Sequence, residues 1–128
     1  MKLRVWNGKE MIQPELFCLS NGMFYETYRD YEDATPLDDC KVMEFIGRKD
    51  EKGIDIYVGD VVKRPEKDCD DVTTYGYYEV IKDDVDLLFK LKTINSVIFK
   101  PESLLSYFGE LSIIANIYEH EYLLQDIL

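Results

Sequence analysis

The chain has 128 residues, a formal net charge of −11 and 46% hydrophobic residues. This length and apolar content suit a single globular domain with its own core, and they exclude an intrinsically disordered chain. The acidity argues against a protein that binds the nucleic-acid backbone, because that affinity comes from Lys and Arg.

Short strands separated by turn signals are predicted along most of the chain. Residues 2–6 form the first strand, and the runs on either side of Asn21-Gly22 form a hairpin over 15–28, because Asn-Gly favours a type I′ turn. The ten Tyr and six Phe residues also favour β structure. Further strands are predicted at 42–46, 54–57, 61–63, 72–82, 87–93, 96–100 and 111–118. Polar loops are predicted at 30–41, 48–53 and 64–71.

Helical character is expected only near the C-terminus. Pro101 can open one or two helical turns, and the apolar spacing in 119–128 predicts a short amphipathic helix. The sequence thus predicts a mainly β (α+β) fold, a small, partly open β-barrel of short antiparallel strands with a hairpin and a C-terminal helix. Within one domain, 1–128, we expect a strand and hairpin, an acidic connector, a barrel core and a helix, at 1–30, 30–41, 42–118 and 119–128.

Residue types that bind metals are sparse. The sequence has no CxxC pair, and its cysteines are Cys18, Cys40 and Cys69. With His120 as the single histidine, we expect no zinc site and no cofactor. Free thiols suit a reducing cytoplasm. Neither a signal peptide nor a run of roughly 20 apolar residues is recognisable, so we expect no membrane association.

Other candidate chemical groups favour structural interpretations. Two acidic clusters resemble parts of a calcium loop but lack its glycine and closing glutamate, so we interpret them as solvated loop charge, with a weak cation site as the alternative. These clusters are Asp68, Asp70 and Asp71, and Asp83, Asp84 and Asp86. His120 has no partner that the sequence identifies, so an exposed polar role is favoured.

The pair Gly59-Asp60 interrupts two strand-like runs. A carboxylate at this position could serve as an acid–base group. It could also accept hydrogen bonds from backbone N–H groups and hold a tight turn, with the glycine supplying backbone freedom. The second interpretation is favoured because no partner group is identifiable.

Three segments in order, LRVWNGKEM (3–11), VMEFIGRKDEKGIDIYVGDVVK (42–63) and SIIANIYEHEYLL (112–124), resemble the YopX family of phage and prophage proteins. The matching residues of the first segment are Arg4, Trp6 and Met11. Those of the second are Gly47, Asp50, Gly53, Ile56, Tyr57, Gly59, Asp60, Val61 and Val62. Those of the third are Asn116, Ile117, Tyr118, Glu119, Leu123 and Leu124.

This resemblance implies a β-rich, small-barrel-like fold that assembles with copies of itself. It further implies a phage or prophage origin, hence the cytoplasm of a bacterial host, and no established enzymatic activity. It also implies structural roles for the motif residues: glycines for turns, Asp60 for a corner, and Trp6 and Tyr57 for the core. We therefore expect a non-catalytic accessory protein that acts by self-assembly or by binding a host or phage protein.

Three other classes of function remain open. The first is an acidic inhibitor of a basic host protein. It is suggested by the net charge of −10 over residues 30–86, which contain eighteen acidic and eight basic side chains. The second is a small β-barrel that binds single-stranded nucleic acid through aromatic side chains, which the net charge opposes. The third is an enzyme, which an Asp60→Ala substitution would test, because a turn residue affects stability and a catalytic one affects activity.

Overall fold

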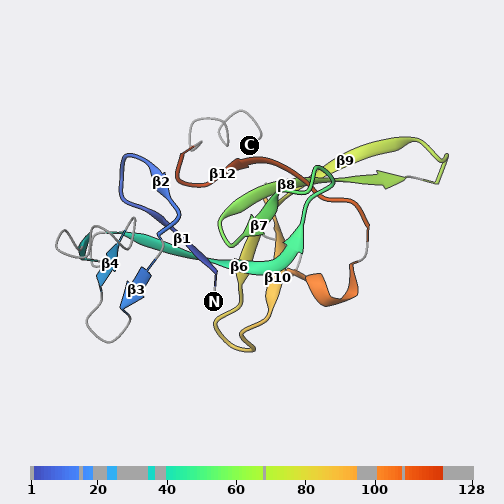
Figure 1. Cartoon of the computed structure of the whole chain (residues 1–128). Helices are drawn as coiled ribbons and strands as arrows, with labels where there is room; N and C mark the ends of the chain where they lie inside the picture. Colours follow the sequence, from blue (N-terminus) through green and yellow to red (C-terminus); the bar gives the residue numbers. More distant parts are fainter. Residues whose placement is uncertain are drawn as a thin grey trace. The chain divides into compact units, whose positions relative to one another are not determined.

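The structure of the protein is a computed structural model that describes residues 2–14, 16–18, 23–25, 35–36, 40–67, 69–94, 101–107 and 109–119. It divides the chain into two compact units, Met1–Phe45 and Ile46–Leu128. The described part is mainly β, with antiparallel sheets and without an α-helix (Figure 1). The predicted fold class is therefore confirmed in its β character, and the single domain stays a prediction.

The first unit contains two small sets of paired strands. They are β1 (Leu3–Trp6), β2 (Met11–Ile12), β3 (Leu16–Cys18), β4 (Met23–Tyr25), β5 (Thr35–Pro36) and the first half of β6 (Lys41–Lys49). Strand β1 lies between β2 and β6, with Val5 opposite both Ile12 and Val42. The alternation of burial along β1 puts Leu3 and Val5 on its buried face, as expected for a strand with one face against a core.

The predicted hairpin is confirmed in its two strands. Phe17 of β3 pairs with Phe24 of β4 in an antiparallel register, while the turn residues Asn21 and Gly22 lie outside the described residues. Strand β5 then pairs with β4 through Thr35 and Phe24. The predicted loop 30–41 was therefore wrong at this point, because two of its residues extend the β3-β4 sheet rather than lying free.

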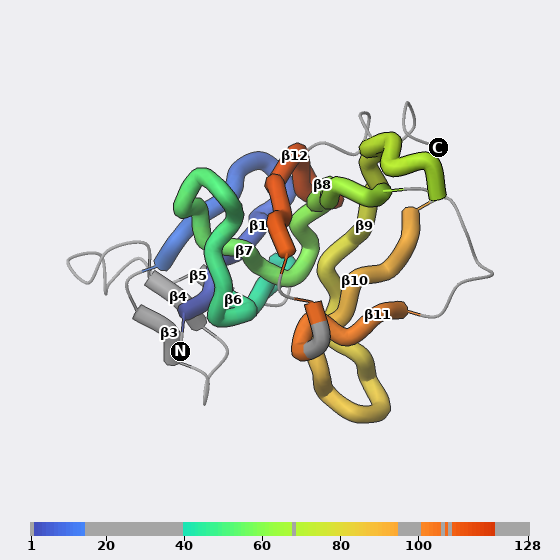
Figure 2. Tube along the Cα trace, turned by 90° about the vertical axis from the view of Figure 1, so that its right-hand side faces the viewer, coloured from blue at the N-terminus to red at the C-terminus, as the bar shows by residue number. Residues whose placement is uncertain are grey.

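The second unit is built on a five-stranded sheet in the order β11-β10-β9-β8-β12, curved into a half-barrel (Figure 2). The elements of the second unit after β6 are β7 (Asp55–Tyr57), β8 (Asp60–Lys67), β9 (Thr73–Lys82), β10 (Phe89–Thr93), β11 (Glu102–Ser103), the 3₁₀ turn η2 (Leu104–Ser106) and β12 (Ser112–Asn116). The core on the inner face consists of Ile56, Val62, Tyr78, Val80, Leu91 and Leu111. Burying these side chains supplies most of the driving force for this unit.

The predicted polar loop at 64–71 was wrong for residues 64–67, whereas residues 69–71 do lie between two strands. Strand β8 continues to Lys67, and Arg64, Pro65 and Glu66 pair with the long strand β9. The charged residues are held in the strand by cross-strand contacts: the Arg64 guanidinium lies 4.4 Å from the Tyr78 ring centroid, and the Lys63 ammonium lies 4.8 Å from that of Tyr75. Such pairs offset the low strand propensity of the local sequence.

Helical character after Pro101 is confined to one 3₁₀ turn, which follows the two-residue strand β11. Residues 120–128, most of the predicted C-terminal helix, lie outside the described residues, as does the strand predicted at 96–100. No helix in the part of the chain that the structure describes is long and apolar enough to cross a membrane.

Candidate functional site

Asp50 of the family motif holds the corner between β6 and β7. One carboxylate oxygen accepts hydrogen bonds from the backbone N–H groups of Lys52 and Ile54, both at 2.9 Å. The other accepts from the N–H of Ile113 on β12 at 3.3 Å. Asp50 is only 8% exposed, so it joins a local turn to a strand that is distant in sequence. Gly53 completes the turn at a φ of +80°, which favours glycine.

Asp60 lies at the first position of β8 and is 1% exposed. Its carboxylate accepts a hydrogen bond of 2.9 Å from the N–H of Tyr57, three residues earlier. Gly59, at a φ of +97°, links strand β9 to the turn after β12, because its N–H donates to the C=O of Val80 and its C=O accepts from the N–H of Ile117. The central motif therefore closes a corner whose backbone polar groups are hydrogen-bonded inside the protein.

Asn116 ends β12 and begins a second side-chain-capped turn. Its side-chain oxygen accepts from the N–H groups of Tyr118, at 3.0 Å, and Glu119, at 2.7 Å. Its amide nitrogen donates to the Glu119 carboxylate at 2.9 Å. This reciprocal pattern resembles a capping box. Burial raises the pKa of Tyr118, and the negative charge of Glu79 raises it further.

The other motif residues have framework positions. Tyr57 is 2% exposed and Ile56 is fully buried. Trp6 is half-buried on β1, and Arg4 donates to the Met43 sulfur at 3.4 Å. Gly47 lies within β6 at a φ of +83°.

The other residues that the sequence suggests as possible reactive or metal-binding groups are cysteines, His120 and aspartates. Cys40 is half-buried and Cys69 is exposed. His120 and Asp68 lie outside the described residues. Among the residues that the structure describes, no three His, Cys, Asp or Glu side chains are grouped so as to hold a metal ion.

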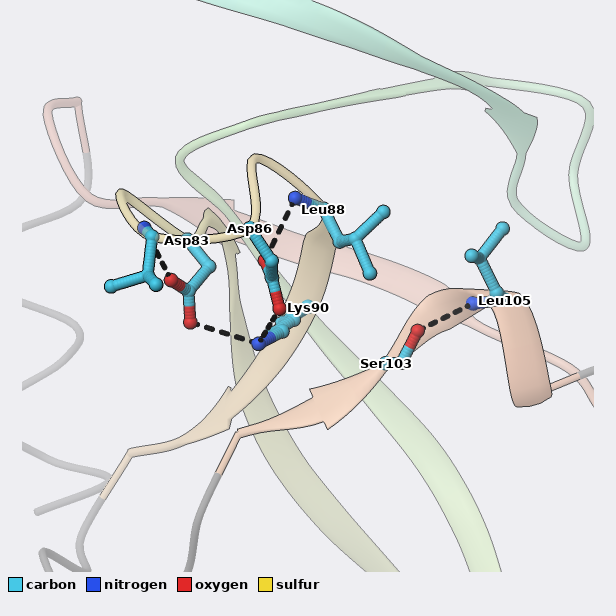
Figure 3. A network of polar contacts seen from close by, with 7 residues as sticks. Asp83, Asp86, Leu88, Lys90, Ser103 and Leu105 are labelled. Atoms are coloured by element: carbon cyan, nitrogen blue, oxygen red, sulfur yellow. Dashed lines mark hydrogen bonds and ion pairs between the residues drawn. The ribbon is translucent and has the colours of Figure 1, made fainter.

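The turn between β9 and β10, residues 83–88, is instead the most unusual exposed feature, and we call it the apolar-tipped turn. Two of its acidic residues, Asp83 and Asp86, point toward Lys90 (Figure 3). Lys90 forms ion pairs with Asp83 at 2.8 Å and with Asp86 at 2.7 Å. The other oxygens of these carboxylates accept from the N–H groups of Val85, at 2.8 Å, and Leu88, at 3.0 Å. Asp83 and Asp86, which the sequence alone indicates to be solvated loop charge, therefore stabilise the turn through these contacts.

This arrangement shifts three pKa values. Hydrogen bonds from the Lys90 ammonium, followed by those from backbone N–H groups, lower the pKa of Asp83 and Asp86. The two carboxylates raise the pKa of Lys90 in return. All three groups are therefore charged over a wide pH range around neutrality. We call their two ion pairs the brace, and the brace stays intact over this range.

Apolar side chains in and next to the braced turn are exposed to solvent. Val85 at the tip is 93% exposed, Leu87 is 64% exposed, and Leu105 of η2 is 71% exposed. Leu87 also has a φ of +61°, the left-handed region that costs a branched residue roughly 1 kcal/mol. The left-handed residue closes the hairpin, because the Leu87 N–H donates to the Asp83 C=O at 3.0 Å and the Asp83 N–H donates to the Leu88 C=O at 2.9 Å. Glycine or asparagine would fill this position at lower cost, so the exposed leucine there makes the apolar-tipped turn a candidate for function.

A groove of ≈ 290 Å³ lies next to this turn. Its lining is apolar except for one arginine and consists of Ile46, Arg48, Leu87, Leu88, Phe89, Leu104 and Leu105. Arg48 donates to the backbone C=O groups of Tyr107, at 2.6 Å, and Gly109, which fixes one wall. We call the groove and the apolar-tipped turn together the apolar surface.

The sequence interpretation missed this surface because residues 83–86 were predicted to be only an acidic turn. The available signal was Val85, followed by Leu87 and Leu88, directly next to aspartates. Leucines were assigned to a strand from 87, but β10 begins at Phe89, so they belong to the turn.

Comparisons with known proteins agree with the fold. A family model described as YopX protein matches residues 2–125. Among solved structures, the chain is similar to the crystal structure of protein EF1440 from Enterococcus faecalis. The two chains are 22% identical, with a TM-score of 0.57, and 96% of each chain is covered. No curated protein matches the chain significantly.

Proposed function

Because the chain belongs to the YopX family, we propose that it is a non-catalytic accessory protein of a phage or prophage, which acts by binding a partner protein through the apolar surface. The observation that carries this proposal is the braced turn, which holds Leu87 exposed at a φ of +61°. A non-catalytic role is supported by Asp50 and Asp60, whose carboxylates accept hydrogen bonds from backbone N–H groups.

Charge indicates the kind of partner. The chain carries a net charge of −11, and the apolar-tipped turn contains three aspartates, two of which pair with one lysine, Lys90. A partner with an apolar patch ringed by Lys and Arg complements both features. A second copy of the chain, which the family resemblance suggests, is the alternative occupant, but two copies repel each other at low salt.

Leu87→Asn tests the proposal. Asparagine tolerates the left-handed conformation better than leucine, so the melting temperature should stay level or rise. Capture of the partner from a lysate of host cells that carry the element should be lost, because the apolar side chain is gone. Val72→Asn is the matched control, since Val72 is 54% exposed but lies outside the apolar surface.

Two readouts separate the possible outcomes. A captured protein that is retained by Val72→Asn, lost with Leu87→Asn and weakened by high salt supports the proposal. Light scattering on the purified chain shows whether a homo-oligomer forms, and its dissociation in Leu87→Asn would make a second copy the occupant. The same captured proteins with both variants would contradict any role of this surface.

A further inference from the structure

Charged side chains occupy part of the inner face of the half-barrel. Along β8 the inward-facing row runs from Val62, in the core, to Arg64 and Glu66. Inward-facing positions of a strand are normally apolar, because burying a charge is costly unless it is paired. The inner face therefore changes from an apolar core to a polar end.

Arg64 is held rigidly at this end. Its guanidinium carbon lies 4.4 Å from the Tyr78 ring centroid and 4.9 Å from that of Tyr107. Its Nε lies 3.2 Å from Glu66, and its Nη1 lies 2.6 Å from Glu102. Burial lowers the pKa of Arg64, but the hydrogen bonds with Glu102 and Glu66 outweigh this and raise it overall. The arginine is thus a fixed cation between two carboxylates.

A cavity of ≈ 490 Å³ opens beside this arginine. Its size falls within the range of small-molecule sites, and barrel mouths are common places for them. The lining consists of Arg64, Glu66, Gly76, Tyr77, Tyr78, Leu91, Thr93 and Glu102.

Gly76 helps to keep this space open. A Cβ on Gly76 would lie 2.8 Å from the Tyr78 hydroxyl and still closer to Glu66. The absence of a side chain there allows the Tyr78 hydroxyl to donate its hydrogen bond to Glu66.

The charges of the lining decide the ligand class. One arginine faces two glutamates, so the lining is net negative. Arg64 and Tyr78 engage only the Oε1 atom of Glu66, and Arg64 engages only the Oε2 atom of Glu102. Within the described part of the chain, the second oxygen of each glutamate has no hydrogen-bond partner. An anion at Arg64 would lie beside the carboxylates of Glu66 and Glu102, which repel it, whereas a cation meets acceptors that are still available.

We propose that this cavity binds a small organic cation, with an ammonium or guanidinium group paired to Glu66 and Glu102. The Thr93 hydroxyl, on the same cavity wall, adds a neutral acceptor. This site is separate from the apolar surface and does not depend on the partner-binding function.

The proposal is tested by titrating the purified full chain with putrescine. Binding is monitored through the backbone amide chemical shifts in NMR spectra. Butane-1,4-diol is the matched neutral probe, because it has the same carbon chain without charge, and acetate is the anionic probe. We expect saturable shifts centred on Gly76 and Thr93 with putrescine, and none with the other two compounds.

Two variants distinguish this site from general attraction to an acidic protein. Glu102→Gln should weaken putrescine binding by about tenfold or more, since a charge-assisted hydrogen bond is lost. Glu110→Gln removes the same charge from an exposed residue outside the cavity and should change little. Gly76→Ala, which narrows the cavity and leaves the charges intact, should also weaken binding. Equal effects of Glu102→Gln and Glu110→Gln, or shifts spread over all acidic residues, would overturn the proposal.

Discussion

The corner at Asp50 allows a stability effect to be worked out from individual hydrogen bonds. Asp50→Ala removes the acceptor of three backbone N–H groups, those of Lys52, Ile54 and Ile113. Lys52 and Ile54 are exposed, so water can replace the carboxylate at a cost of roughly 0.5–1 kcal/mol each. Ile113 is half-buried, and its unpaired N–H costs about 1–2 kcal/mol.

Together these terms lower the free energy of unfolding by about 2–4 kcal/mol. For a chain of this size, that corresponds to a melting temperature lower by roughly 6–20 °C. Urea unfolding followed by far-UV circular dichroism measures the change. Asp50→Asn should be intermediate, because its amide oxygen still serves two donors while its NH₂ group faces the N–H of Ile113.

Glu51→Gln is the control, because it removes an adjacent exposed charge without touching the corner. A loss below about 0.5 kcal/mol in Asp50→Ala, smaller than the net effect of a single ordinary hydrogen bond, would refute the hydrogen-bond argument. So would an Asp50→Asn variant that is less stable than Asp50→Ala.

Two further predictions follow from the other carboxylates. Asp60→Ala should lower the free energy of unfolding by about 1–3 kcal/mol in urea unfolding, because the N–H of Tyr57 is left unpaired in a buried site; unchanged stability would favour a catalytic role. The brace of Asp83, Asp86 and Lys90 should persist above the ordinary carboxyl pKa of about 4 and below the ordinary lysine pKa of about 10.4. It should loosen as pH falls through the lowered carboxyl pKa or rises through the raised lysine pKa. Hydrogen exchange of the turn amides in the folded protein measures this, and protection factors corrected for intrinsic exchange that do not change while the two carboxylates titrate would contradict it.

The strands were predictable where the signal was local. Alternating and β-branched residues at 72–82 predicted β9 almost to its ends, and Asn21-Gly22 predicted the β3-β4 hairpin. The C-terminal half of β8 was not predictable, because Arg64 and Glu66 are stabilised by Tyr78 and Glu102 across the sheet. Hydrophobic periodicity carries no information about such pairs.

The site shows the same division. The bond from Tyr57 to Asp60 spans three residues, so the turn role of Asp60 could be inferred from sequence. The bond from Ile113 to Asp50 spans 63 residues and depends on topology. Likewise, Leu87 is exposed and has a positive φ because β10 begins only at Phe89. The sequence of the two leucines does not show where that strand begins.

Strand β6 passes from one compact unit to the other without a linker. Its first half pairs with β1 in the first unit. A cut at Phe45 would therefore split a strand and leave open edges that recruit other chains. Either half expressed alone should aggregate, and proteases should spare residues 41–49. Recombinants of the gene that still give folded protein are accordingly expected to have their breakpoints outside the codons for β6.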